Sequence, residues 1–130
     1  MYTPQSIYNL VSAANTSLCI QYTTPYVQMA VCAINNTQQW NFTSNATLIS
    51  AYQPTQDLSA GVGCTNGTFL AVGTILGDSS ELYSYNATSE QLSTCGGTLC
   101  AAVTNTSVGA LVTTATCNAS DTRQSWLFGV

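Results

Sequence analysis

The fold is decided by Gln38-Gln39-Trp40 and by two later stretches of the same pattern, Glu81-Leu82-Tyr83 and Gln124-Ser125-Trp126. The aromatic residue that ends each stretch lies 43 residues after the previous one. A further aromatic residue follows two positions later each time, at Phe42, Tyr85 and Phe128. A fixed period of this length indicates a repeated supersecondary unit that cannot bury its apolar face alone. Three units are too few for an open array with separate caps, so we expect one closed body with Trp40, Tyr83 and Trp126 packed near its centre.

The residues between these stretches favour strands. Short apolar runs at 18–22, 27–31, 69–72 and 110–114 are separated by Thr, Ser, Asn and Gly. Thr, Val, Tyr and Ile fit a pleated, half-buried surface, and no run has the apolar period of a helix. About four strands in each repeat give roughly twelve short strands and an all-β fold. With 130 residues we expect a single domain, 1–130, with repeats at about 1–43, 44–86 and 87–130.

The chain carries very little charge. Charged residues make up 5% of it, Arg123 is the only cation, and the net charge is −4. A basic patch cannot be built from one cation, which argues against nucleic acid and acidic lipid as partners. No apolar run approaches the ~20 residues of a membrane span, so we expect no membrane insertion.

Sequons and cysteines together indicate a secreted glycoprotein. Asn-X-Ser/Thr occurs eight times, at Asn15, Asn35, Asn41, Asn45, Asn66, Asn86, Asn105 and Asn118. Glycans would supply the solubility that the sparse charge does not, and six cysteines suit an oxidising compartment. The start of the sequence has neither the charged nor the apolar region of a signal peptide, so we expect any leader to be missing from this sequence.

The repeated pattern resembles the ricin B-type lectin β-trefoil family. In repeat one the resemblance runs through Leu18-Cys19-Ile20, Cys32 and 38–42, and in repeat three through Leu99-Cys100-Ala101, Cys117 and 124–128. Repeat two is degenerate, with Leu58 near the first cysteine position, Ile75 near the second and Tyr83 in place of the Trp. The resemblance implies a β-trefoil in which Gln38, Glu81 and Gln124 bond backbone groups of the adjacent turn.

The family also implies a disulfide within a repeat, which here gives Cys19–Cys32 and Cys100–Cys117. Cys64 and Cys95 remain, and we expect them to pair across repeats two and three. Six cysteines allow 15 pairings, so spacing alone does not choose among them. Without any histidine or CxxC pair, we expect no metal site and no cofactor.

A working sugar pocket of this family has an Asp two residues after the first repeat cysteine, an aromatic platform, and an Asn or Gln near the Gln-X-Trp. The Asp position falls on Gln21 in repeat one, on about Ala60 in repeat two, with Asp57 close by, and on Ala102 in repeat three. Repeat one keeps most of the pattern. The resemblance therefore implies a candidate carbohydrate site of Gln21, Tyr26, Asn36 and Gln38, beside the Asn35 sequon.

The other two repeats keep less of that pocket. Phe69 offers a platform in repeat two, although its polar partner is undefined. In repeat three Val108 and Ala110 stand where an aromatic residue is needed, so we expect no site there.

An enzyme is not expected. Without histidine no Ser-His-Asp or Cys-His arrangement can be built, and cysteines held in disulfides are not nucleophiles. A glycosidase needs two carboxylates that face each other across a sugar, and the closest pair in sequence, Asp78 and Glu81, is explained by a turn and a motif position.

Glycans are therefore the first expected partner. The alternative is an extracellular coat or matrix protein that self-associates into an oligomer or filament and binds no sugar. A third reading is a secreted inhibitor or effector that presents its loops to a protein target.

Overall fold

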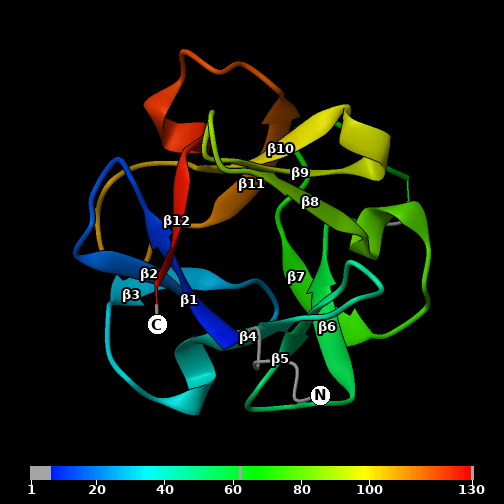
Figure 1. The fold of residues 1–130 in the computed structure, drawn as a ribbon. Coiled ribbons are helices and arrows are strands. Elements are labelled where there is room, and N and C mark those ends of the chain that lie inside the picture. The colour runs from blue at the N-terminus through cyan, green and yellow to red at the C-terminus, as the bar shows by residue number, and fades with distance from the viewer. Residues whose placement is uncertain (1–6, 62, 130) are drawn as a thin grey trace, which may run out of the picture.

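The computed structural model describes residues 7–61 and 63–129, in which twelve strands and four single-turn 3-10 helices form three lobes around a common centre (Figure 1). The first repeat contains β1 (Ile7–Ser12), β2 (Leu18–Gln21), β3 (Gln28–Val31), η1 (Asn36–Gln38) and β4 (Gln39–Phe42). The second contains β5 (Leu48–Ser50), β6 (Gln56–Ser59), β7 (Ala71–Thr74), η2 (Ser79–Glu81) and β8 (Tyr83–Asn86). The third contains β9 (Gln91–Thr94), η3 (Cys95–Gly97), β10 (Leu99–Val103), β11 (Val112–Thr116), η4 (Thr122–Gln124) and β12 (Trp126–Gly129).

Six of the strands, two from each repeat, surround the centre. β1 pairs with β4 and β12, β4 pairs with β5, and β8 pairs with β9, all antiparallel. The two remaining junctions are made by the Tyr83 N–H, which donates to the Ala46 carbonyl at 2.7 Å, and by a bridge between Gln91 and Ser125. These contacts close the six strands into a barrel, as a β-trefoil requires.

The other six strands form three hairpins, β2–β3, β6–β7 and β10–β11, that contact one another. The Val27 N–H donates to the Leu70 carbonyl at 3.2 Å, and the Leu70 N–H donates to the Val112 carbonyl at 2.8 Å. The Met29 N–H donates to the Ala110 carbonyl at 2.8 Å. Each hairpin is therefore tied to its neighbours by backbone hydrogen bonds between repeats.

These inter-hairpin bonds correct two of the expected strands. The runs expected at 69–72 and 110–114 begin two residues later in the structure, at Ala71 and Val112. Leu70 and Ala110 use their backbone groups for the neighbouring hairpins and so do not join the ladders of their own. The spacing of apolar residues cannot distinguish these two kinds of pairing.

The three motif aromatics lie in the core, as predicted. Trp40 and Trp126 are fully buried and Tyr83 is 3% exposed, in one cluster with the buried leucines of β1, β5 and β9. The indole N–H of Trp40 donates to the Ile20 carbonyl at 3.2 Å, and that of Trp126 donates to the Ala101 carbonyl at 2.9 Å. Each indole thus ties its barrel strand to the hairpin of the same repeat.

Disulfides reinforce the repeats and connect two of them. Cys19–Cys32 and Cys100–Cys117 each link strands within one hairpin, with Cα atoms 5.0 Å apart. Cys64–Cys95 connects the second repeat to the third. The expected pairing is confirmed. Separately, no helix among residues 7–61 and 63–129 is long and apolar enough to cross a membrane.

Candidate carbohydrate site

The motif residues Gln38, Glu81 and Gln124 are all 2% exposed and hold the turn that precedes their strand. Gln38 accepts the Ala33 N–H at 2.7 Å and donates to the Val31 carbonyl at 2.9 Å. Gln124 makes the same pair of bonds with Asn118 and Thr116, at 2.8 and 2.9 Å. The predicted role of the motif glutamines as backbone partners is therefore confirmed.

Glu81 differs from the two glutamines because a carboxylate accepts hydrogen bonds but has no N–H to donate. Its Oε1 accepts from the backbone N–H groups of Leu76, at 2.7 Å, and Gly77, at 3.0 Å. The carbonyl of Thr74, which corresponds to that of Val31, has no side-chain donor from Glu81. In the second repeat the motif side chain therefore holds its turn only as a hydrogen-bond acceptor.

Strand register places Asp57, rather than Leu58, at the first cysteine position of repeat two. In the first hairpin Cys19 pairs with Ala30 in the strand ladder, and its disulfide partner Cys32 lies two residues after Ala30. In the third, Cys100 pairs with Ala115, and its disulfide partner Cys117 lies two residues after Ala115. Asp57 pairs with Gly73, and the residue two positions farther on is Ile75. The expected position of Leu58 was wrong by one residue, and the residue two after the cysteine position is Ser59, not Ala60.

Asp57 is fully buried, and neither of its carboxyl oxygens has a hydrogen-bond partner in the structure. Burial, then the interaction with Glu81 and a smaller effect of Asp78, raise the pKa of Asp57 to about 8. Tyr83 lies beside these acids, and its hydroxyl is also buried without a partner. Asp57 therefore belongs to an interior acid cluster and offers no surface to a sugar.

Of the four residues expected to form a site in repeat one, Gln21 and Gln38 are hydrogen-bonded to each other, whereas Tyr26 packs against the second repeat. Gln38 is buried and its amide is occupied by backbone groups and by the Gln21 side chain, 3.2 Å away, so we remove it from the candidate sugar contacts. Gln21 is half-buried, and Asn36 is exposed at the start of η1. Tyr26 lies elsewhere, against Phe69 of the second repeat.

Tyr26 and Phe69 flank a groove of about 370 Å³ between repeats one and two. Their ring centroids are 5.3 Å apart with 59° between the ring planes, and the two side chains are 40% and 38% exposed. The rest of the groove is lined mainly by repeat two, including Ser59, Gly73, Thr74 and Leu76. Gln21 and Asn36 do not line it.

Hydrogen bonds hold the backbone of both aromatic residues. The Thr23 hydroxyl donates to the Tyr26 carbonyl at 2.6 Å, and Phe69 forms a bridge with Thr113 of the neighbouring hairpin. The two rings are one 43-residue period apart, and each precedes a fully buried residue, Val27 or Leu70. That periodicity is the signal in the sequence that could have paired them.

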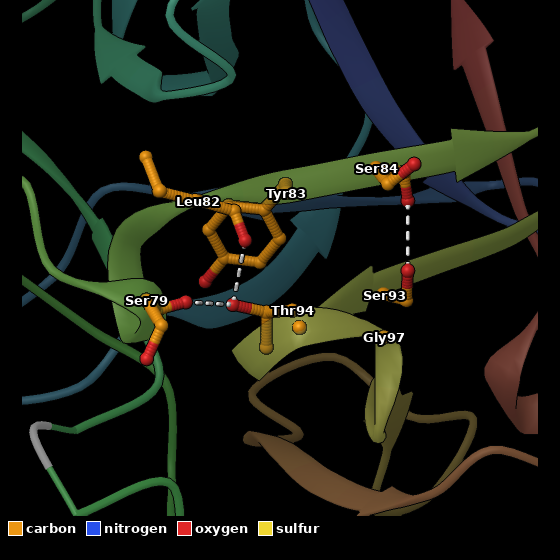
Figure 2. Close-up of a pocket in the computed structure, with 8 residues that line it drawn as sticks. Ser79, Leu82, Tyr83, Ser84, Ser93, Thr94 and Gly97 are labelled. Carbon is orange, nitrogen blue, oxygen red and sulfur yellow. Dashed lines mark hydrogen bonds between the residues drawn. The ribbon is translucent and has the colours of Figure 1, made fainter.

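A second hollow, of about 250 Å³, lies between β8 and β9 (Figure 2). Figure 2 shows the Thr94 hydroxyl bonded to the carbonyls of Ser79 and Leu82, at 3.2 and 2.9 Å, and Ser93 bonded to Ser84 at 3.3 Å. The hollow is open beside Gly96 and Gly97, whose φ angles are positive and where a Cβ would meet nothing within 4 Å. With the Thr94 and Ser93 hydroxyls already bonded and no exposed aromatic ring in its lining, this hollow suits a sugar less well than the groove.

Repeat three has no comparable groove residues. Ala102 and Ala110 are each 5% exposed, and Val108, which is exposed, carries no aromatic ring. In the described residues no three His, Cys, Asp or Glu side chains are grouped as metal ligands would be. The Tyr26–Phe69 groove is thus the candidate site.

No family model matches the sequence, and no curated protein matches it. Solved structures do match. An agglutinin from Abrus precatorius has a TM-score of 0.84 at 12% identity, over 98% of this chain and 48% of its own. ThreeFoil, a designed threefold-symmetric protein, has a TM-score of 0.83 at 15% identity, over 96% of this chain and 99% of its own. The β-trefoil lectin of the Vibrio vulnificus hemolysin/cytolysin was solved with N-acetyl-D-lactosamine bound. It has a TM-score of 0.77 at 14% identity, over 98% of this chain and 96% of its own.

The length of the matched chains varies widely. This chain spans about half of the Abrus agglutinin, but 17% of a mosquitocidal holotoxin and 22% of GalNAc-T7. The Abrus agglutinin, the Vibrio lectin and an earthworm R-type lectin are named as agglutinins or lectins, whereas GalNAc-T7 is described with UDP, GalNAc and Mn2+. Barrel, hairpin triplet, motif residues and matched structures agree. The chain has a β-trefoil fold.

Proposed function

We propose that this chain is a non-enzymatic carbohydrate-binding module and that the Tyr26–Phe69 groove is its binding site. The observation that carries the proposal is the pair of exposed rings, 5.3 Å apart, at the edge of a groove that also contains hydroxyl groups. Aromatic faces pack against the C–H face of a sugar, while the exposed Thr74 in the groove lining can exchange hydrogen bonds with its hydroxyl groups.

The groove suits a neutral ligand. Among the described residues that line it, Glu81 is the only charged one and is 2% exposed, so this lining offers no accessible fixed charge to an ionic ligand. A site of this kind binds weakly by itself, and useful affinity would come from several copies acting together.

A glycan array probed with a dimeric fusion of the chain tests the proposal. Replacing Tyr26 or Phe69 by alanine should lower the signal at least ~10-fold, which corresponds to ~1.4 kcal/mol of binding free energy. Both rings are more than a third exposed, so these changes should leave folding intact. Tyr52→Ala is the matched control, because Tyr52 is 46% exposed and does not line the groove.

Two results would contradict the proposal. Absence of binding to every glycan would count against a lectin, and equal binding by Phe69→Ala and the wild type would place the site elsewhere. In the second case the candidates Gln21 and Asn36, on the surface of repeat one, would be the next residues to replace.

The proposal includes secretion and N-glycosylation. Six sequon asparagines are exposed, while Asn15 and Asn41 are half-buried. The Nδ2 atoms of Asn15 and Asn66 donate to Thr106 and Thr116, so a glycan there would compete with existing contacts. We expect Asn35, Asn45, Asn86, Asn105 and Asn118 to be occupied first. Mass spectrometry of the secreted protein before and after amidase treatment checks this order.

A second candidate function, self-association, is favoured by apolar side chains at the tip of repeat one. Val31 is 63% exposed and Ile34 is 88% exposed, on either side of Cys32. If this tip forms contacts between copies, sedimentation velocity should show concentration-dependent oligomers that Ile34→Asp abolishes. A monomer at every concentration would remove this candidate and leave carbohydrate binding untouched.

A further inference from the structure

The wall of the groove in repeat two is held in an unusual way. Leu76, which lines the groove, and Gly77 both donate their backbone N–H to the single carboxylate oxygen Oε1 of Glu81. Repeats one and three reinforce the same turn with a disulfide and a glutamine that both accepts and donates. Repeat two lacks the disulfide because Asp57 and Ile75 stand at the cysteine positions, and it lacks the glutamine because Glu81 takes its place.

The same hairpin contains the buried carboxyl group of Asp57. Its strand position pairs with Gly73, which lines the groove, so Asp57 and the wall share one hairpin. The groups that face Asp57 are Glu81 and Asp78, at the end and the cap of η2, and the phenol of Tyr83 in β8. None of these is a cation.

No positive charge compensates this cluster. Arg123 is the only cation of the chain, and it bonds Asp121 at 3.3 Å in the third repeat, where its side chain is largely exposed. Two ionised carboxylates that face each other in a buried place repel strongly, and one of them must hold a proton for the arrangement to persist. The neutral form of Asp57 is the one that fits the closed hairpin.

We propose that the groove is gated by a proton on Asp57: with the proton in place the wall at 73–77 stays closed against Glu81, and loss of the proton releases the wall and weakens ligand binding. The expected weakening of ligand binding rests on the proposed function of the groove. The movement of the wall is a property of the hairpin itself. The raised pKa of Asp57, about 8, places the change in mildly alkaline solution.

The direction of the pH effect follows from linkage. In an open hairpin the Asp57 carboxyl would meet water and titrate near its ordinary pKa of 3.8, whereas in the closed hairpin it titrates near 8. The closed form therefore holds more protons than the open form between these values. The equilibrium constant for opening should rise about tenfold per pH unit in that window and level off above it.

Amide hydrogen exchange of Leu76 and Gly77, measured from pH 5 to pH 9 and corrected for intrinsic exchange, tests the gate. Protection in the wild type should fall about tenfold per pH unit towards pH 8. Asp57→Asn, which keeps the shape and cannot ionise, should give protection that does not change with pH. Glu81→Gln should end the fall at a lower pH, because it removes the neighbouring charge. Asp121→Asn, which changes a half-buried acid in the third repeat, should behave like the wild type.

Binding to immobilised N-acetyl-lactosamine at pH 6 and pH 9 separates the gate from the lectin function. Wild-type binding that weakens at pH 9, with Asp57→Asn binding equally at both, supports both ideas. No binding at either pH, with the exchange behaviour as expected, leaves the gate standing and counts against this sugar as ligand. Protection at Leu76 and Gly77 that is independent of pH in the wild type would overturn the gate, whatever the protein binds.

Discussion

Asp57 and Ile75 occupy in the second repeat the two positions that disulfide-bonded cysteines occupy in the first and third. The register is the same in all three hairpins: Asp57 pairs with Gly73 as Cys19 pairs with Ala30, and the bonding partner lies two residues farther on. The second hairpin is consequently the one without its own covalent link. It is also the one that carries the groove and the buried acid cluster.

Introducing the missing link should stabilise this hairpin. The double change Asp57→Cys and Ile75→Cys is expected to form a disulfide, since the equivalent pairs have Cα atoms 5.0 Å apart. The free energy of unfolding should rise by ~2–4 kcal/mol from the restricted unfolded chain. Removal of a buried, unpartnered carboxyl adds to this gain. Chemical unfolding under oxidising and reducing conditions measures it.

The single change Ile75→Cys controls for the added thiol. A double variant whose two thiols still react with a thiol reagent after oxidation would show that the second hairpin does not share the geometry of the other two.

Global stability should depend on pH through Asp57. Because its folded-state pKa, about 8, lies above the ordinary value of 3.8, the folded protein binds more protons than the unfolded chain between these values. The free energy of unfolding should therefore fall as pH rises from about 4 to 8, by up to ~1.4 kcal/mol per pH unit. In Asp57→Asn this slope should disappear. Urea unfolding of both proteins at several pH values measures the slope. A slope in Asp57→Asn equal to that of the wild type would mean that another group titrates.

Replacement by phenylalanine should change the stability of the protein differently at Tyr83 and at Trp40. The Tyr83 hydroxyl is buried without a partner, so Tyr83→Phe should be neutral or stabilising by up to ~1 kcal/mol. Trp40→Phe removes an N–H that donates to Ile20 at 3.2 Å and also leaves a cavity, so it should destabilise by ~2–4 kcal/mol. Thermal unfolding of both variants provides the comparison, and a strongly destabilised Tyr83→Phe would imply a hydrogen bond to its hydroxyl.

The ion pair between half-buried Asp121 and exposed Arg123 should stabilise the fold through the helix cap and little through charge. Asp121 accepts the backbone N–H of Arg123 at 3.0 Å and caps η4, and this bond, followed by that to the Arg123 side chain, lowers the pKa of Asp121. Arg123→Ala should therefore cost under ~0.5 kcal/mol, whereas Asp121→Ala should cost ~1 kcal/mol through the lost cap. Equal effects of the two changes in a denaturant titration would assign the stabilisation to the ion pair.

Much of the fold could be predicted because the motif repeats. Trp40, Tyr83 and Trp126 recur at one period with a Gln or Glu two residues before each, and that recurrence fixes the symmetry and the buried centre. Two of the disulfides were implied by the resemblance to the lectin family, and the third joins the two cysteines that remained.

The candidate site was less predictable, for two physical reasons. The first strand of repeat two has no cysteine, so apolar Leu58 was aligned where buried Asp57 stands, and only the ladder with β7 settles the register. Tyr26 was assigned to the repeat that contains it. Its ring packs against Phe69 across the boundary between repeats, a contact that depends on how the hairpins meet and not on spacing within one of them.

The most direct test of the account is a nuclear magnetic resonance titration of the labelled protein with the glycan that gives the strongest array signal. We predict amide shifts confined to the groove, at Tyr26, Ser59 and Phe69 and along 71–76, and lost in Phe69→Ala. Shifts that cluster around Gln21 and Asn36, or that persist unchanged in Phe69→Ala, would contradict the assignment of sugar binding to the groove between repeats one and two.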